Sequence, residues 1–364
     1  RIMKNNRCDY ISDIERRKAD RINTSSGYRL DMAERLIDYP QGFIETFLDE
    51  LNDEDFIVYP KEALVKELQY LISSNNSVSL KNVLIDSGSD AIIKNCYHSL
   101  CNERESIVIG NPSFPMYRIY ANMFGLELIE VGYDNSLNFD LQKIIESIDD
   151  NTRMVVLANP NSPYGDIQIK SDIVDLLNIL ESKDIYLLLD EAYVDFGGES
   201  MSGLIKKFDN LIVLKTFSKA WGAAGSRVGY CLSNQENIRQ IEKVQLTYPV
   251  SNTSIKFAIY LYKNHENVDR YIKETIRERD ELVSRLQNLD YDVFPTSNNS
   301  IHFHDKEDNS RAVGIFKKHN VSFKTGATAS TPLKVPGDSR DTWIRIGVGS
   351  GILDAPYIQE LLVR

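Results

Sequence analysis

Features that define several large classes of proteins are missing from this 364-residue sequence. No apolar run reaches the roughly 18 residues that a membrane-spanning helix needs, so we expect no membrane partner. No long basic run is present, and 42 Lys+Arg against 53 Asp+Glu leave a formal charge of −11. Because an acidic chain repels a phosphate backbone, we also expect no nucleic-acid partner.

Cysteine is scarce too, with Cys8, Cys96, Cys101 and Cys231 the four in the chain and no Cys-x-x-Cys pair among them. So few cysteines in so long a chain make no disulfide framework, and inert thiols are expected. The polar residues 1–4 lead into a charged stretch at residues 14–20, unlike a signal peptide with an apolar centre. We therefore expect a cytoplasmic protein.

Short apolar runs bounded by turn residues alternate with amphipathic stretches through the middle of the chain. This pattern predicts an α/β fold, with a mostly parallel sheet between helices. The expected strands are Asn82–Ile85, Ser106–Ile109, Glu127–Val131, Met154–Ala158, Ile185–Leu189, Leu211–Lys215 and Val228–Leu232, with helices at Ala91–Leu100, Asp172–Leu180 and Ile238–Leu246. A long charged helix is expected at 268–289, its charges forming a solvated face. Strands and helices after residue 300 predict a smaller α+β domain.

The most informative segment follows the expected strand at Leu211–Lys215. It carries the hydroxyls of Thr216 and Ser218, then Lys219, then small residues leading to Arg227. An amine for Schiff-base chemistry therefore lies within a short reach of groups that can hold a phosphate. The alternative is a strand end with a surface lysine.

Two further strand ends carry polar residues of interest. Asp190 ends a very apolar strand, where open α/β sheets bind their ligands, and a protonated pyridine nitrogen would be a suitable partner for a desolvated carboxylate there. The alternative is an Asp that caps the next helix. Gly88, Ser89 and Asp90 form a tight turn into a helix, whose N-terminus favours a phosphate. A rigid Asn-Pro loop at 159–165 is expected at the same edge.

Taken in order, these segments resemble the fold-type I pyridoxal phosphate enzymes, and most closely the histidinol-phosphate aminotransferase branch of the class I/II aminotransferases. The resemblance covers roughly residues 28–363 and is carried by Ser218-Lys219, by Gly225-Ser-Arg-Val-Gly229 and by Asp190-Glu-Ala-Tyr193. It implies a large cofactor-binding domain at 51–265, a small C-terminal domain at 266–364, and an N-terminal segment at 1–50 that contributes to the small domain and to a homodimer.

The resemblance also implies a role for each matching residue. Lys219 is the Schiff-base and catalytic lysine, Asp190 the partner of the pyridine nitrogen, and Tyr193 a donor to the phenolic oxygen of pyridoxal 5'-phosphate. The other cofactor contacts implied are the phosphate-binding Gly88, Ser89, Asp90, Thr216, Ser218 and Arg227, the stacking Phe114, and Tyr59 from the neighbouring subunit. Arg345 resembles the substrate-binding arginine of the family.

The sequence departs from the family pattern at residues that would contact the cofactor or the substrate. The loop asparagine expected to contact the phenolic oxygen is Ser162 here, so either Ser162 or Asn161 serves that role. A second distal arginine is replaced by Lys324, which keeps the charge and loses the planar fork. The N-terminal substrate segment is also altered, reading Leu30-Asp-Met-Ala-Glu-Arg35.

The leading hypothesis is a pyridoxal phosphate-dependent aminotransferase that acts on a small-molecule amino donor and keto acceptor, one of them bearing an acidic group such as phosphate. The first alternative is a decarboxylase of a phosphorylated amino acid, and the second a non-catalytic regulatory domain. His302 and His304 share one side of an expected strand, but no third ligand cluster accompanies them, so no metal is expected.

Overall fold

The structure is a computed structural model that describes residues 27–134, 139–294, 296–305, 309–325 and 343–363. Cys8 and the charged stretch at 14–20 lie outside these ranges. Within them Cys96 and Cys231 are buried free thiols and Cys101 is half-buried, as the sequence predicts. No helix of the described ranges is both long and apolar enough to cross a membrane.

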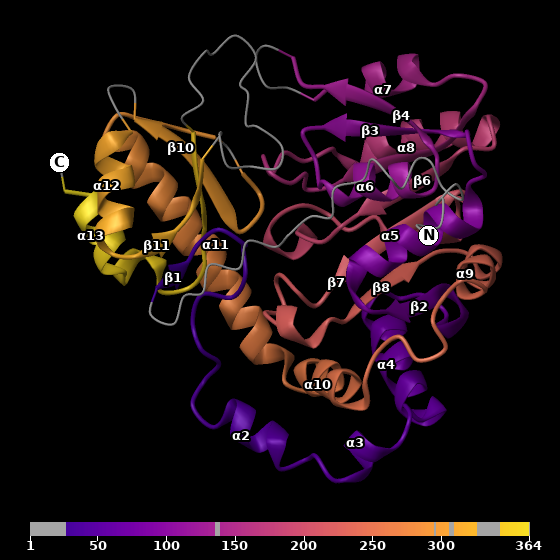
Figure 1. Ribbon diagram of the computed structural model, residues 1–364, viewed down its shortest axis with the longest axis horizontal. Coiled ribbons are helices and arrows are strands. Elements are labelled where there is room, and N and C mark those ends of the chain that lie inside the picture. The colour runs from indigo at the N-terminus through magenta and orange to yellow at the C-terminus, as the bar shows by residue number, and fades with distance from the viewer. Residues whose placement is uncertain (1–26, 135–138, 295, 306–308, 326–342, 364) are drawn as a thin grey trace, which may run out of the picture.

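A seven-stranded sheet forms the larger part of the molecule (Figure 1). Its strands, in spatial order, are β2 (Val83–Asp86), β8 (Gly229–Leu232), β7 (Leu211–Thr216), β6 (Tyr186–Asp190), β5 (Thr152–Ala158), β3 (Ser106–Asn111) and β4 (Glu127–Gly132). Only β8 runs antiparallel to its neighbours. The mostly parallel sheet that the sequence predicts is therefore confirmed.

Helices cover both faces of this sheet because alternate strand residues point to opposite sides. On β6, Leu187 and Leu189 join one apolar core, whereas Leu188 joins another. The first core also takes residues from α4 (Glu62–Asn75), α7 (Leu141–Ser147), α8 (Lys170–Ser182) and α10 (Asn252–Lys263). The second takes them from α5 (Gly88–Leu100), α6 (Met116–Met123) and α9 (Gln235–Glu242).

A smaller antiparallel sheet forms a separate layer, in the order β12 (Lys324–Thr325), β13 (Ile344–Gly347), β10 (Ser300–Asp305) and β9 (Tyr291–Val293). The short β1 (Tyr28–Arg29) pairs in parallel with β11 (Val321–Ser322), which ties the N-terminal segment to this layer. A third core lies here and includes residues of α12 (Ser310–Lys318) and α13 (Pro356–Leu361). The long α11 (His265–Asn288) runs from α10 to this core (Figure 1).

The short helices α2 (Phe43–Leu48) and α3 (Glu54–Ile57) lie along the lower edge of the view in Figure 1. Short 3-10 turns connect the other elements, at Leu80–Asn82, Val194–Phe196, Ser202–Lys206, Ala224–Ser226 and Ile352–Asp354. The turn at Val194–Phe196 follows β6 directly and contacts α11.

Two sequence predictions about helices are wrong in part. The helix expected at 238–246 begins earlier, because the Asn234 side chain accepts a hydrogen bond from the Asn237 amide and caps it, and it ends at Glu242. Leu246, counted as part of that helix, is 73% exposed. In α11 the charges do not all face solvent, since Glu278 and Arg279 are each 6% exposed. A pattern of charges alone did not reveal that two of them have buried partners.

Candidate active site

The carboxyl ends of β5, β6 and β7 meet at one edge of the large sheet and carry the predicted site residues. The register pairs Ala158 with Asp190 and Asp190 with Leu214, so the loops after these three strands begin side by side. Asn159, the first residue after β5, donates its amide to the Asp190 carbonyl at 2.8 Å. Ligands of open α/β sheets bind at such an edge.

A second group of predicted residues is brought together by β8. Gly229 pairs with Asp86 of β2 on one side and with Thr216 of β7 on the other. A Cβ on Gly229 would lie 2.5 Å from the Gly88 carbonyl carbon and 2.5 Å from the Ser89 nitrogen. The Gly88-Ser89 turn therefore lies directly over β8, which only a glycine at position 229 permits.

Arg227 lies against the same turn. We call the Gly88-Ser89 turn, Thr216, Ser218 and Arg227 together the anion cradle. The Arg227 Nη2 would be 2.7 Å from a Cβ on Gly88, which has φ +81°, so no side chain fits between the guanidinium and the start of α5. Thr216 and Ser218 close the other side, with a hydrogen bond of 3.0 Å between their hydroxyls. Backbone N–H groups at the start of α5, two hydroxyls and an arginine are suited to an anion such as phosphate.

Tyr120 lies near this cradle and was not predicted from the sequence. Burial raises its pKa to about 12, with Asp90 raising it and Arg227 lowering it. The phenol therefore stays protonated between a carboxylate and a guanidinium. Nothing in the sequence indicated that Tyr120, in α6, would lie near Asp90 and Arg227.

Asp190 is 5% exposed, and burial raises the pKa of its carboxyl, although the Tyr117 hydroxyl and the Ala192 amide both lower it. Tyr117 donates to Oδ2 at 2.7 Å and Ala192 to Oδ1 at 3.0 Å. Two neutral donors do not supply a positive charge, so a cationic group at this carboxylate would favour its ionised form.

The Phe114 ring lies beside this acid, edge-on to the Tyr117 ring, with centroids 5.6 Å apart and planes at 80°. Phe114 lies two residues before α6 and Tyr117 lies in its first turn, where positions three apart share a face. Phe114 is half-buried, as a ring that stacks on a flat ligand would be. Tyr117 was missed in the sequence, but its spacing from Phe114 was the available signal.

Lys219 and Tyr193 meet above this edge. The Lys219 Nζ donates to the Met32 carbonyl at 3.1 Å and lies 5.4 Å from the centroid of the Tyr193 ring. Burial would raise the pKa of Tyr193, yet the charges of Lys219 and Arg345, with hydrogen bonds from Ser162 and Lys219, lower it below its usual value. The lysine amine thus lies beside a phenol whose pKa is lowered by two positive charges.

The two candidate residues of the Asn-Pro loop differ in what they contact. The Asn161 side chain donates to the Pro112 carbonyl at 3.1 Å and to Tyr133, and accepts from Ser113 at 2.9 Å. It is therefore held within the loops. Ser162 instead helps to lower the pKa of Tyr193, so of the two it is the side chain that acts on the phenol beside the lysine.

The predicted substrate residues form a row across the small sheet. Arg345 on β13 pairs with Lys324 on β12 and with His302 on β10, so the three share one face. His302 is fully buried, and burial followed by the charge of Arg345 lowers its pKa well below the usual value. Among the described residues no group of three or more His, Cys, Asp or Glu side chains could hold a metal ion.

Tyr59 lies apart from this edge, directly after α3. Its ring is 73% exposed and stacks on Tyr248, with centroids 4.4 Å apart and planes at 12°. Phe56 and Ile57 beside it are 70% and 76% exposed. The structure of one chain thus gathers the other predicted residues and leaves Tyr59 on an apolar surface.

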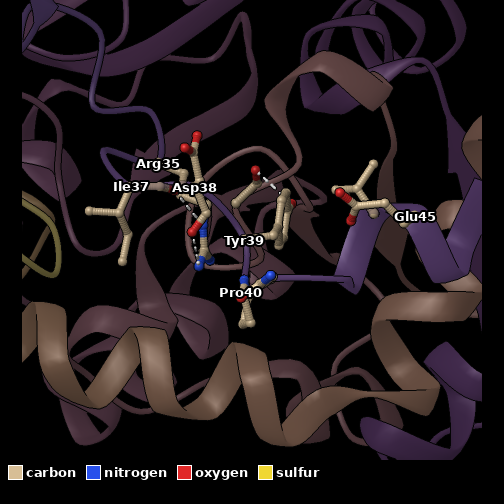
Figure 2. Close-up of a pocket in the computed structure, with 9 residues that line it drawn as sticks. Arg35, Ile37, Asp38, Tyr39, Pro40 and Glu45 are labelled. Carbon is tan, nitrogen blue, oxygen red and sulfur yellow. Dashed lines mark hydrogen bonds between the residues drawn. The ribbon is translucent and has the colours of Figure 1, made fainter.

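A cavity of about 520 Å³ lies next to the loop that carries Lys219 (Figure 2). The Arg35 guanidinium, in its wall, lies between the rings of Tyr39 and Tyr271, at 4.4 and 4.1 Å from their centroids. Tyr39 donates to the Gly222 carbonyl at 3.0 Å. These contacts hold the altered N-terminal segment, which supplies the Met32 carbonyl, against the loop after Lys219.

The chemistry of this site fits pyridoxal phosphate. The anion cradle suits its phosphate, the buried Asp190 suits a protonated ring nitrogen, Phe114 offers a flat ring, and Lys219 an amine. The residues that would hold each part lie at one sheet edge, although they come from four separate segments of the chain.

Comparison with known proteins agrees with this geometry. The profile of the family "Aminotransferase class I and II" matches residues 29–361. A histidinol-phosphate aminotransferase of Clostridium novyi is 29% identical over 324 residues, which cover 88% of this chain and 87% of that protein.

Two solved structures share the fold. One is a histidinol-phosphate aminotransferase from Sinorhizobium meliloti in complex with pyridoxal-5'-phosphate, with a TM-score of 0.75, 20% identity, and coverage of 92% of this chain and 88% of that one. The other is an L-threonine-O-3-phosphate decarboxylase from Porphyromonas gingivalis, with a TM-score of 0.74, 23% identity, and coverage of 92% and 98%. The fold-type I architecture predicted from the sequence is therefore confirmed.

Proposed function

The chain belongs to the class I and II aminotransferase family and is an enzyme of that family, and from this premise we propose that it transfers the amino group of a small, acidic donor that bears phosphate. The observation that carries the proposal is the Lys219 amine beside the Tyr193 ring, with Nζ 5.4 Å from the ring centroid, at the edge where Asp190 ends β6. The charge of Arg345 also lowers the pKa of that phenol, so a guanidinium that can bind an acidic substrate faces the same site.

Pyridoxal 5'-phosphate is the cofactor, and when bound it supplies an electron-withdrawing ring that weakens the bonds at the substrate carbon. Gly88, Ser89, Thr216, Ser218 and Arg227 would bind its phosphate, with Asp90 beside them in the first turn of α5. Asp190 would pair with its ring nitrogen and Phe114 would stack on the ring. Tyr193 and Ser162 would hold the phenolic oxygen, a role that the contacts of Asn161 do not favour.

Lys219 has two tasks in this scheme. It would hold the cofactor covalently through Nζ, and with substrate bound its amine would move a proton at the substrate carbon. Tyr193 and the Met32 carbonyl orient that amine, since both are in contact with it. The Met32 carbonyl accepts a hydrogen bond from Nζ and so fixes the direction in which the amine points.

Arg345 and Lys324 bind the acidic group of the substrate. They lie directly opposite each other on β13 and β12, and two positive charges match a dianion such as phosphate. Lys324 in place of an arginine keeps the charge but drops one bidentate contact, which suits a group other than the one bound in histidinol-phosphate aminotransferases.

The direct test is to reduce the purified holoenzyme with borohydride and to locate the pyridoxyl group by peptide mass spectrometry. We expect it on Lys219. A pyridoxyl group on another lysine would overturn the assignment. Amino donors are then screened one at a time without acceptor, with conversion of the cofactor to its amine form as the readout.

The same assay separates transamination from the decarboxylase alternative. Transamination converts the cofactor to its amine form in a single half-reaction. A phosphorylated amino acid that instead releases carbon dioxide and leaves the cofactor spectrum unchanged would assign the protein as a decarboxylase.

We also propose a cytoplasmic homodimer in which Tyr59 reaches the cofactor phosphate of the neighbouring subunit. Support comes from the surface around Tyr59, where Phe56, Ile57, Leu246 and Tyr248 are all more than half exposed. So many exposed apolar side chains together are typical of an interface. A two-fold axis would bring this surface against its own copy.

Mixed dimers test the shared site. A Lys219→Ala chain and a Tyr59→Ala chain, each impaired alone, are unfolded together and refolded as a mixture. We expect part of the activity to return, because some mixed dimers carry one intact site. A fully active monomer at assay concentration would contradict the proposal.

A further inference from the structure

Two adjacent charged residues of α11, Glu278 and Arg279, are buried in an otherwise solvent-facing run of charges. They lie on the helix face that Thr275, Leu282 and Leu286 also bury. A buried guanidinium is costly unless its donors are paired, so the partners of Arg279 indicate what it does.

Arg279 joins the two layers of the molecule. Its Nη1 donates to the carbonyl of Phe196, in the turn after β6, at 3.0 Å, and to the carbonyl of Asn298, just before β10, at 3.2 Å. Its Nε pairs with the exposed Asp280 at 2.8 Å. One side chain therefore holds a loop of the large sheet and a loop of the small sheet at a fixed separation.

The Asn298 loop in turn contacts the Asn-Pro loop of the candidate site. Asn298, fully buried, donates from Nδ2 to the Asn161 carbonyl at 3.3 Å, and the Ser297 amide donates to the Gly165 carbonyl at 2.8 Å. A Cβ on Gly165 would lie 2.2 Å from the Thr296 hydroxyl, and one on Gly197 2.8 Å from the Ser297 Cβ. These loops leave no room to slide past one another.

Both loops reached in this way carry side chains of the site. Phe196 follows Tyr193 by three residues, and Ser162 follows Asn161 directly. Tyr193 and Ser162 therefore lie on two loops whose separation is set from outside by Arg279 and Asn298.

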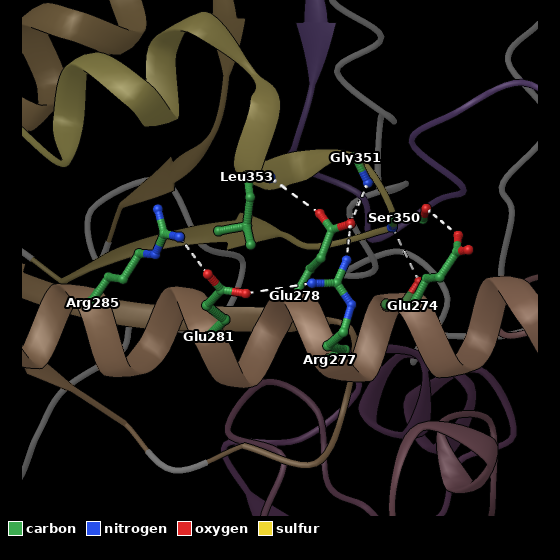
Figure 3. Close-up of polar contacts among 9 residues, drawn as sticks. Glu274, Arg277, Glu278, Glu281, Arg285, Ser350, Gly351 and Leu353 are labelled. Carbon is green, nitrogen blue, oxygen red and sulfur yellow. Dashed lines mark hydrogen bonds and ion pairs between the residues drawn. The ribbon is translucent and has the colours of Figure 1, made fainter.

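The neighbouring residue Glu278 binds the chain that follows β13, the strand of Arg345 (Figure 3). It accepts the amides of Gly351 at 3.0 Å and Leu353 at 3.2 Å, while the Ser350 amide donates to Thr275 at 3.2 Å. These residues follow β13, which carries Arg345. The same two turns of α11 thus hold the cofactor loops and the end of the substrate strand.

We propose that Arg279 and Asn298 are positioning residues, which hold Tyr193 and Ser162 in the arrangement that the reaction needs without touching substrate or cofactor themselves. The inference rests on the proposed function, because that function gives Tyr193 and Ser162 their roles. A shift of even 1 Å in such groups can cost about 100-fold in rate.

The test compares holoenzyme carrying Arg279→Met with Arg285→Met. Arg285 lies on the same helix, pairs with Glu281 and is 47% exposed, so it is the matched control. For Arg279→Met we expect kcat to fall by about 10-fold or more with KM changed by less than about threefold, because Arg345 keeps its place on β13. The pH midpoint of the visible cofactor absorbance should move by about half a unit or more.

The control should match the wild type in all three measurements. A variant that loses thermal stability but keeps the wild-type kcat and spectral midpoint would reduce Arg279 to a structural role and overturn the proposal. If Arg279→Met does not fold, Asn298→Ala and Arg279→Lys are measured in its place. For both we expect kcat and the spectral midpoint to change in the same direction as for Arg279→Met, but less. Wild-type protein without pyridoxyl on Lys219 would refute the proposed function, whereas loaded wild type with unaffected variants would refute this inference alone.

Discussion

The cofactor side and the substrate side of the site are built differently. On the cofactor side, Gly88, Asp190 and Lys219 each lie at or just after the carboxyl end of a strand of the large sheet, and each lies in a short motif that a sequence displays whole. On the substrate side, Lys324, Arg345 and His302 come from three strands and meet only through antiparallel register. The first arrangement follows from local sequence, while the second depends on how strands pair.

This difference matters for how each side tolerates change. Buried backbone contacts, such as Gly229 against the Gly88 turn, leave the cofactor side no space for adjustment. The substrate side uses long side chains that can change without moving the strands, as Lys324 does in place of an arginine. Variants of residues on each side test this contrast between the cofactor side and the substrate side.

Lys219→Ala should have the largest effect. Loss of the amine removes the covalent attachment and the group that moves the proton, so turnover should fall by about 100- to 10,000-fold or more. Turnover and the visible absorbance of the purified protein are the measurements. Retained turnover in this variant would mean that another residue carries the chemistry.

Arg345→Ala should come next and should act on binding as well as rate. Removing one partner of a desolvated charge pair costs about 2–4 kcal/mol, or about 30- to 1,000-fold in kcat/KM. We expect KM for the acidic substrate to rise while cofactor affinity stays near the wild-type value. A parallel loss of cofactor affinity would show that substrate binding and cofactor binding do not depend on separate residues.

Tyr117→Phe should have a smaller effect, confined to the cofactor side. It removes the hydroxyl that donates to Asp190 at 2.7 Å, and a hydrogen bond to a charged group is worth about 1.5–3 kcal/mol. Weaker cofactor affinity is expected, with KM unchanged at saturating cofactor. Equilibrium titration with pyridoxal phosphate measures the first quantity, and Tyr120→Phe serves as a comparison on the same helix.

The pH dependence of stability should reveal His302 on the substrate side. Its pKa is lowered well below 6.5 by burial and by Arg345, so below pH 6.5 the unfolded chain binds a proton that the folded chain does not. Stability should therefore fall with decreasing pH below this value, by on the order of 1 kcal/mol per pH unit.

Urea unfolding at pH 5 and pH 8 measures this dependence, with His302→Leu as the matched variant. The part of the acid loss that belongs to His302 should be absent from the variant. Equal pH dependence in both proteins would contradict a buried neutral imidazole.

Much of the fold and of the cofactor side could be predicted from the sequence. Strands such as β6 and β7 appear as apolar runs that end in Asp190 and Thr216, and their bounds differ from the prediction by one residue. The end of the helix at 238–246 could not be placed, since the sequence after Glu242 continues with residues that a helix tolerates.

By itself the sequence determined the order of the elements, the candidate lysine, the acid and the anion-binding turn, because each depends on residues close together in the chain. The tertiary structure alone shows that the Asn161 side chain is held by Pro112 and Ser113, that Tyr117 donates to Asp190, and that Arg279 is buried. These outcomes depend on contacts between distant segments. The direction of a side chain and the partner of a buried charge are set by what packs against them, and a linear pattern does not contain that information.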